Sequence, residues 1–131
     1  MIGLDTNILI RYLTQDDPVQ SAKASEIFER RLTTHNPGFA SIVTMVETVW
    51  VLDRAYRLKA QEIATAVARP LQVEVLAIEN EQEVFTAMAA LKQGRGSFAA
   101  ALIAELGARA GCIRTLTFDQ KAVRLPGFEL V

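Results

Sequence analysis

Short apolar segments alternate with longer amphipathic segments along the whole chain, and this alternation constrains the possible fold more than any other feature. Apolar runs that are too short for helices predict strands at Met1–Leu4, Phe39–Ile42, Val73–Ile78, Ile113–Phe118 and Phe128–Val131. Apolar residues at helical spacing predict helices over 6–13, 18–32, 43–57, 59–71, 81–93 and 98–110. Asp17, Asn80 and Ser97 are predicted to cap the helices that follow them. Strands separated by helices indicate an α/β fold, a three-layer α/β/α sandwich around a short, mostly parallel central sheet.

The length and composition indicate one globular domain over residues 1–131. The chain has 131 residues, half of them hydrophobic and 22% charged, which excludes a disordered chain. Its formal net charge is −1, so overall electrostatic attraction cannot drive binding to nucleic acid or to a membrane. Any such contact must come from a local patch of charge.

Cysteine usage and the first residues predict a cytoplasmic location. Cys112 is the only cysteine, which excludes an internal disulfide framework and a multi-cysteine zinc site, and fits a reducing compartment. Asp5 interrupts the N-terminal apolar run before it could serve as a signal peptide. The longest strongly apolar stretch, Phe98–Ala104, is far too short to span a membrane.

Three carboxylates stand out by their positions. Asp5 and Asp119 each follow a predicted strand directly, and ligands of parallel sheets gather at the carboxyl ends of strands. Glu47 lies in a predicted helix with apolar neighbours such as Val43 and Trp50, which predicts that it lies near the buried side. A buried carboxylate must be paired or bind a metal. Oxygen ligands without histidine or cysteine favour Mg²⁺ or Mn²⁺ over zinc.

Each carboxylate also has an ordinary structural explanation. Asp5 and Asp119 could be helix N-caps, and Glu47 could pair with Arg54 or Arg57 on the same helix. Each of these residues alone is a weak indication of a metal site, and only the three carboxylates together make the pattern specific.

Several segments together resemble the PIN domain family. The chain is similar in length and motifs to the VapC-type toxins of bacterial type II toxin–antitoxin pairs. The segments that carry the resemblance are Met1-Ile2-Gly3-Leu4-Asp5-Thr6-Asn7-Ile8-Leu9, the stretches 41–52 and 97–104, Thr115-Leu116-Thr117-Phe118-Asp119, and the stretch 124–130.

The resemblance implies an Mg²⁺- or Mn²⁺-dependent endoribonuclease that cuts structured cellular RNA, such as tRNA or rRNA. It further implies a homodimer and a small cognate antitoxin that holds the enzyme silent. Asp5, Glu47 and Asp119 match the family's catalytic and metal-binding acids. The polar residues that would support these acids are Thr6, Asn7, Ser97 and Thr117.

One position departs from the family pattern. The family's third acidic residue would fall at position 100, where this chain has Ala100, and Ser97 stands one helical turn earlier. A hydroxyl could replace a carboxylate only weakly because it brings no charge. Either Ala100 is an engineered inactivating substitution, or the protein is naturally a weak or dead nuclease that still binds RNA or antitoxin.

Basic and apolar residues suggest where partners could bind. Arg95, in a glycine turn, and the cluster Arg54, Arg57 and Lys59 are candidate RNA contacts, with solvated side chains as the alternative. The mean hydropathy of +0.19 is high for a small soluble monomer, which suggests a covered apolar surface. A groove for an antitoxin helix could use Tyr12, Leu13, Phe28, Leu32 and Trp50, although these residues could equally be core.

Two other functions remain open from the sequence. A PIN-like module without catalysis could bind RNA or antitoxin and would need no cation. An unrelated phosphotransferase could use Asp5 as its nucleophile, but Asn7 stands where such enzymes have a second aspartate.

Overall fold

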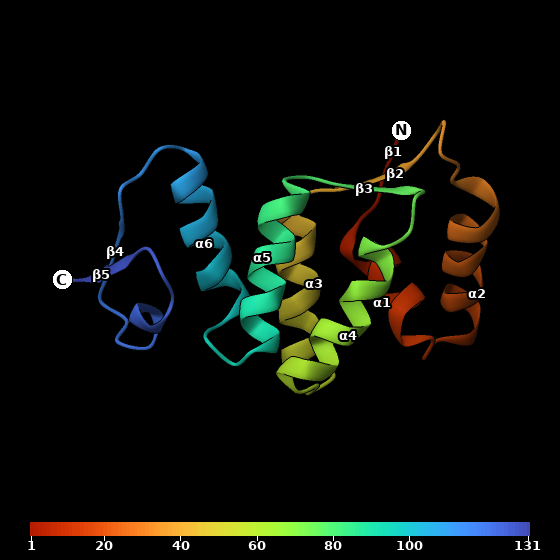
Figure 1. Ribbon diagram of the computed structural model, residues 1–131. Helices are drawn as coiled ribbons and strands as arrows, with labels where there is room; N and C mark the ends of the chain where they lie inside the picture. Colours follow the sequence, from red (N-terminus) through yellow and green to blue (C-terminus); the bar gives the residue numbers. More distant parts are fainter. The chain divides into compact units, whose positions relative to one another are not determined.

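The computed structural model describes the backbone of residues 1–131 and every side chain except those of residues 70 and 71. Residues 1–81 and residues 82–131 form two compact units, which are described one at a time. Figure 1 gives the order and labels of their helices and strands.

The first unit contains a three-stranded parallel sheet. Strand β2 (Gly38–Ala40) lies between β1 (Ile2–Gly3) and β3 (Leu76–Ile78), with Ile2 opposite Gly38 and Ala40 opposite Ile78. Gly38 allows close packing, because a Cβ there would lie 2.7 Å from Cδ1 of Leu4 and that side chain would have to shift. Parallel pairing brings the carboxyl ends of all three strands to one edge of the sheet.

Four α-helices join these strands, and three of them begin at a recognisable cap. Asp5 caps α1 (Thr6–Thr14), Asp17 caps α2 (Pro18–Glu26) with proline at the first helical position, and Ser41 caps α3 (Ile42–Arg54). A π-helical turn, Ile27–Arg31, extends α2, and α4 spans Ala60–Leu71.

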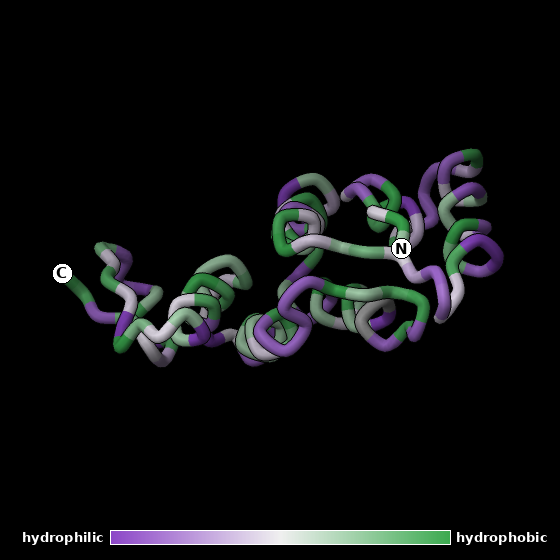
Figure 2. The backbone as a smooth tube through the Cα atoms, turned by 90° about the horizontal axis from the view of Figure 1, so that it is seen from above, coloured by the Kyte–Doolittle hydropathy of each residue, from purple (hydrophilic) through white to green (hydrophobic). Residues whose placement is uncertain are grey.

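The core of the first unit is formed by the inner faces of these helices against the sheet. Its buried side chains include Leu9, Met45, Leu52, Ile63 and Val67. Hydrophilic and hydrophobic residues alternate along the helical tubes in Figure 2, as expected for helices with one solvated face.

The second unit contains two helices, a two-stranded parallel sheet and a short 3₁₀ turn. Helix α5 spans Glu81–Lys92, beginning one residue before the unit, and α6 spans Phe98–Arg109. Strands β4 (Thr115–Thr117) and β5 (Phe128–Leu130) pair in parallel, with the 3₁₀ turn Ala122–Arg124 between them. Val84, Phe98 and Leu102 are buried in this unit. Across the described residues, no helix is both long and apolar enough to cross a membrane.

The structure confirms the α/β class, the parallel pairing and the order of the predicted elements, but some boundaries differ. The helix predicted over 18–32 changes at Ile27 from α-helix to a π turn, which sequence periodicity does not reveal. The third helix ends at Arg54 rather than Arg57, because Arg57 has a left-handed φ of 54°. The strand predicted over Val73–Ile78 begins only at Leu76, since the Leu76 N–H bonds to the Val73 carbonyl in a turn.

Candidate functional site

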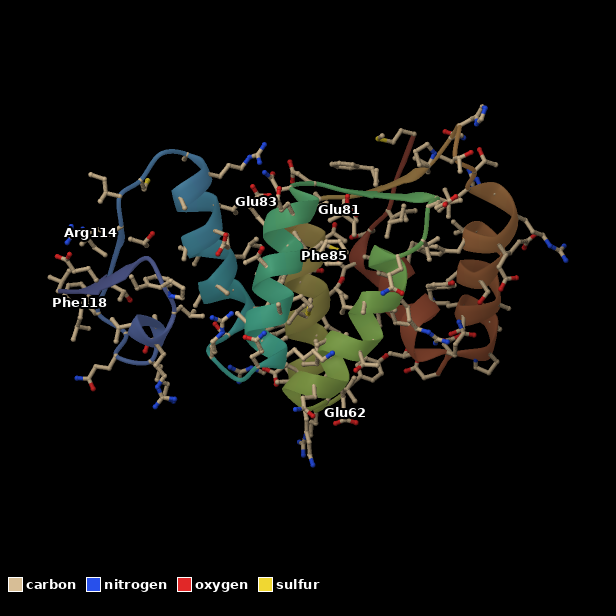
Figure 3. The ribbon with its side chains drawn as sticks, viewed as in Figure 1. Glu62, Glu81, Glu83, Phe85, Arg114 and Phe118 are labelled. Atoms are coloured by element: carbon tan, nitrogen blue, oxygen red, sulfur yellow. The ribbon has the colours of Figure 1, made fainter. Side chains whose placement is uncertain are left out.

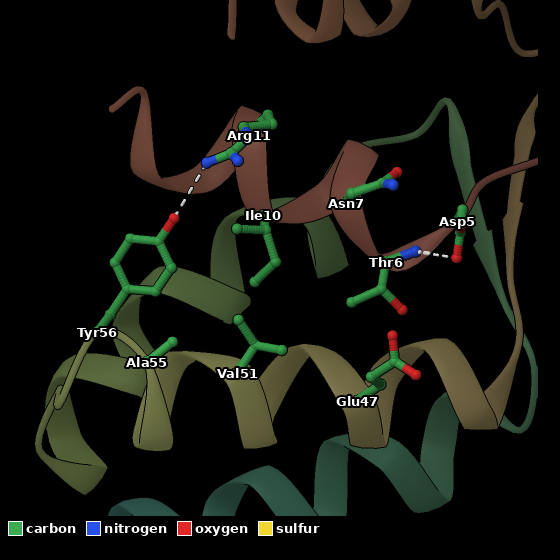
Figure 4. A pocket seen from close by; sticks show the side chains of 9 residues that line it. All are labelled: Asp5, Thr6, Asn7, Ile10, Arg11, Glu47, Val51, Ala55 and Tyr56. Atoms are coloured by element: carbon green, nitrogen blue, oxygen red, sulfur yellow. Dashed lines mark hydrogen bonds between the residues drawn. The ribbon is translucent and has the colours of Figure 1, made fainter. Parts of the chain in front are cut away.

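Asp5 and Glu47 line the same pocket in the first unit. This pocket has a volume of about 360 Å³ and is lined by Asp5, Thr6, Asn7, Ile10, Arg11, Glu47, Val51, Ala55 and Tyr56. Figure 4 shows Asp5 and Thr6 at the start of α1, with the Glu47 carboxylate extending from α3 toward them. Two carboxylates that are 42 positions apart in the sequence thus face one space.

The backbone fixes the position of Asp5. The N–H of Leu4 bonds to the carbonyl of Phe39 at 2.9 Å, which holds the end of the first strand segment against β2. Asp5 then caps α1, and its Oδ1 accepts a hydrogen bond from the Thr6 N–H at 2.7 Å. The cap and the site interpretations of Asp5 are therefore compatible, because the capping carboxylate also lines the pocket.

The sequence pattern predicted that Glu47 lies near the buried side of its helix, and this prediction is wrong. Glu47 is exposed, and so are its apolar neighbours Val43 (72%) and Trp50 (60%). The buried face of α3 is formed instead by Thr44, Met45, Thr48, Val49 and Leu52. The prediction was wrong because α3 is apolar on both faces, so apolar neighbours do not identify the core side.

Arg11 and Tyr56, which no sequence motif indicated, also line this pocket. Nη1 of Arg11 donates to Oδ1 of Asp16 at 3.1 Å and to the Tyr56 hydroxyl at 3.3 Å, and the Tyr56 hydroxyl donates to Oδ2 of Asp16 at 2.7 Å. Hydrogen bonds from Tyr56 and Thr14 lower the pKa of Asp16 to about 2. The available signal was the spacing of Asn7 and Arg11, which places them on one face of α1.

Asp119 lines a different pocket, in the second unit. This pocket has a volume of about 180 Å³, and Ser97 and Ala100 line it together with Asp119. The N–H of Asp119 bonds to the Thr117 hydroxyl at 3.0 Å, and Oδ1 of Asp119 accepts from the Lys121 N–H at 2.8 Å. Thr117 therefore contacts the residue it was predicted to support.

Ser97 acts as a helix cap in this pocket. Its Oγ accepts a hydrogen bond from the N–H of Ala100 at 3.1 Å, and α6 begins directly after it. The hydroxyl that was considered as a substitute ligand is thus already engaged with the backbone of position 100.

Arg54, Arg57 and Lys59, the predicted basic cluster, are all exposed. Arg54 lies 3.8 Å from the carboxylate of Asp53, and both side chains are largely solvated, so this ion pair contributes little. Their contact with RNA stays a prediction.

Two of the five residues predicted for an antitoxin groove are core residues. Phe28 and Leu32 are 5% and 3% exposed, because the turn after α2 folds them into the first unit. Tyr12 stacks on Phe28 with ring centroids 4.0 Å apart, and Tyr12 and Leu13 are half-buried. Of the five, only Trp50 is an exposed apolar side chain.

A comparison with family models identifies the chain. The model of the PIN domain matches residues 2–127, nearly the whole sequence and parts of both units. The chain belongs to the PIN domain family. PIN domains are typically metal-dependent nucleases, often ribonucleases, and generally use divalent metals such as Mg²⁺. No curated protein and no solved structure matches the chain.

The residues of this PIN domain fit a hard divalent cation. Asp5 and Glu47 are exposed carboxylates in one pocket, and within the described side chains neither forms an ion pair. The described residues contain no group of three acidic, histidine or cysteine side chains arranged as metal ligands. Mg²⁺ commonly uses one or two protein carboxylates and completes its shell with waters and substrate phosphates, so two carboxylates suffice for the fit.

Proposed function

We propose that this PIN domain is an Mg²⁺- or Mn²⁺-dependent endoribonuclease of the VapC toxin type, acting in the cytoplasm on structured RNA such as tRNA or rRNA. The observation that carries the proposal is the pocket lined by both Asp5 and Glu47, neither of which forms an ion pair within the described side chains. Family membership over residues 2–127 supports a nuclease in general.

Asp5, Glu47 and Asp119 are the proposed metal-binding and catalytic residues. A bound Mg²⁺ or Mn²⁺ would orient and acidify a water for attack on phosphorus and offset the charge that develops there. No histidine is needed for this chemistry, which agrees with the single, exposed His35 of the chain.

The backbone around these acids supports their proposed roles by limiting how they move. The Thr6 N–H holds the Asp5 carboxylate, and the Lys121 N–H holds that of Asp119. Carboxylates oriented before the cation arrives lose less conformational entropy when they bind it.

We propose that Ala100 lowers the catalytic activity of this enzyme. A carboxylate at position 100 would line the same pocket as Asp119, and the alanine provides neither charge nor ligand there. Ala100 also supports a second candidate function, a PIN module that binds RNA or antitoxin without cutting.

The test is the variant Ala100→Asp, assayed for cleavage of total cellular RNA with Mg²⁺ and with Mn²⁺. We expect cleavage at least about 10-fold faster than with the parent chain, since even groups that only orient metal ligands are worth about 10–100-fold. The matched control is Ala99→Asp. It adds the same charge to the first turn of α6, with the same helix-dipole effect, but Ala99 is exposed and does not line the pocket.

Three results would decide between the candidates. Cleavage by Ala100→Asp that is abolished by EDTA and by an added Asp5→Asn supports the enzyme. If Ala99→Asp cleaves RNA at the same rate as Ala100→Asp, a specific role for position 100 is contradicted. An Ala100→Asp protein that stays inert with both metals would overturn the ribonuclease proposal and leave the binding module.

We also propose a small antitoxin partner and a homodimer, both implied by the resemblance to VapC-type toxins. The exposed apolar side chains of Val43 and Trp50, beside Glu47 on α3, support a protein partner because soluble monomers rarely expose such residues together. Co-expression with the product of the neighbouring small gene, followed by size-exclusion chromatography with light scattering, tests both. A monomer that elutes alone would contradict them.

A further inference from the structure

The pocket that contains Asp119 is strongly cationic. Arg95, Lys121 and Arg124 line it, and Asp119 is its only acidic lining residue. Within the described side chains, none of the three cations forms an ion pair. Three positive side chains around one carboxylate leave a net positive charge and a site suited to an anion.

Other arginines of the second unit are neutralised by partners. Arg109 donates to Glu83 at 2.7 Å, and Arg114 pairs with Glu129; Figure 3 labels Glu83 and Arg114. The cations of the pocket thus differ from their neighbours, because the fold gives them no acidic partner of their own beyond Asp119.

Close packing explains why two distant segments meet at this pocket. Gly96 carries no side chain, and a Cβ there would lie 2.6 Å from Cδ1 of the buried Leu125. The turn that contains Arg95 therefore packs directly on the end of the 3₁₀ turn. A larger residue at position 96 would force the Leu125 side chain to shift.

The 3₁₀ turn places its two cations on one side. Lys121 precedes the turn Ala122–Arg124, so Lys121 and Arg124 are three residues apart, and side chains at this spacing eclipse in a 3₁₀ helix. Ala122, between them, is buried and anchors the turn. The start of α6, a helix of 12 residues, also lies at the pocket and adds its partial positive charge.

We propose that Arg95, Lys121 and Arg124 together bind a single phosphate group of the RNA backbone beside Asp119. This inference rests on the proposed function and names how that substrate is held. The pocket volume of about 180 Å³ is below the range of about 300–1,000 Å³ typical of sites that enclose a small organic ligand, and it suits a phosphate group better than a whole nucleoside. Lys121 and Arg124 gain a role that the sequence motifs did not assign to them.

Salt-dependent RNA binding tests the inference. The parent chain is titrated in EDTA, which prevents cleavage, against a fluorescent single-stranded RNA with a 5′-hydroxyl, and anisotropy is measured at several salt concentrations. For single strands, the slope of log K against log salt is about −0.7 for each phosphate neutralised. We expect Arg95→Ala, Lys121→Ala and Arg124→Ala each to weaken binding several-fold. In the triple variant the slope should become less steep by about 0.7, the value for one phosphate, because the three cations bind the same phosphate group.

Lys92→Ala is the matched control. Lys92 is an exposed lysine at the end of α5, three residues before Arg95, and it does not line the pocket. We expect RNA binding by this variant to match that of the parent. Thermal unfolding of every variant checks that these exposed substitutions leave the fold intact.

Several outcomes would overturn the inference. If the pocket variants bind RNA as tightly as Lys92→Ala does, the three cations do not contact RNA. If the slope of the triple variant changes by about 2.1, the value for three phosphates, each cation binds a separate phosphate and the three do not form one site. If calorimetry detects inorganic phosphate in the pocket while RNA does not bind, the pocket serves a free anion. RNA cleavage by Ala100→Asp with unchanged binding by the pocket variants would overturn this inference alone and leave the proposed function standing.

Discussion

Asp16 and Tyr56 are 40 positions apart in the sequence, and the 2.7 Å hydrogen bond between them links the loop after α1 to the segment after α3. Arg11 joins the same network through both groups. The network orients the Arg11 side chain at one end of the pocket that contains Asp5 and Glu47. Its effect is measurable on a single carboxyl group.

We predict that Tyr56→Phe raises the pKa of Asp16 from about 2 toward the ordinary value of 3.8, because the Tyr56 hydroxyl is the largest contributor that favours the carboxylate. A carbon-detected NMR titration of the Asp16 carboxyl measures this directly. An unchanged Asp16 pKa in Tyr56→Phe would show that Thr14 and Arg11 suffice.

The same shift predicts how stability depends on pH. Asp16 has a lowered pKa in the folded state, so its contribution is complete above pH 3.8 and is lost as the pH falls toward about 2. We expect urea unfolding midpoints to fall less between pH 5 and pH 2.5 in Tyr56→Phe than in the parent. Equal falls in the two proteins would contradict this linkage.

At the scale of elements, most helix starts follow from local chemistry. Oδ1 of Asp17 accepts from the N–H groups of Val19 and Gln20 at 3.0 and 2.8 Å, and Pro18 begins α2 with a φ already suited to a helix. This cap depends on residues adjacent in the sequence, which is why it could be predicted.

We predict that Asp17→Ala lowers the free energy of unfolding by about 1 kcal/mol, since it leaves two N–H groups of the first turn without their side-chain acceptor. Asp17→Asn should retain most of the stability because its amide oxygen also accepts. The control is Asp53→Ala, an exposed aspartate with only a long ion pair, for which a change within about 0.5 kcal/mol is expected. Urea denaturation measures all three, and equal losses at both aspartates would reject the cap.

The start of α3 depends on more than local chemistry. Ser41 caps it, as its Oγ accepts from the Thr44 N–H, but Glu79 also contributes, because its Oε1 accepts from the Ile42 N–H at 2.9 Å. Glu79 follows β3, and only the pairing of β2 with β3 brings it to this helix. The sequence pattern placed Ser41 in the strand predicted over Phe39–Ile42, so this cap was not predicted, and nothing near the helix start in the sequence indicated Glu79.

At the scale of the whole molecule, the proposed function makes a prediction about metal binding. Isothermal titration of the parent chain with Mn²⁺ should show binding that weakens by about 10-fold or more in Asp5→Asn, Glu47→Gln and Asp119→Asn, because each loses a charged oxygen ligand. Asp53→Asn, an exposed aspartate on the outer part of α3, should bind Mn²⁺ like the parent. A parent chain that binds no Mn²⁺, or loss confined to one of the three acids, would contradict the proposed set.

The α/β class, the order of strands and helices, and the caps at Asp5, Asp17 and Ser97 could be predicted from the sequence. These features depend on residues that are close together in the sequence, so the local pattern is sufficient to predict them. The cap at Ser41 was not predicted, and Asn80, which was predicted to cap α5, has a left-handed φ of 50°.

The tertiary structure alone decided which side chains share a space. Both faces of α3 carry apolar residues, so the local pattern does not show which face is buried. Packing in the first unit buries the face with Met45 and Leu52 and leaves Glu47 exposed. The tertiary structure also brought Arg95 to Lys121 and Arg124, because Gly96 packs on Leu125 across almost thirty residues of chain. Contacts between residues this far apart arise from close packing of the core, and no short-range pattern encodes them.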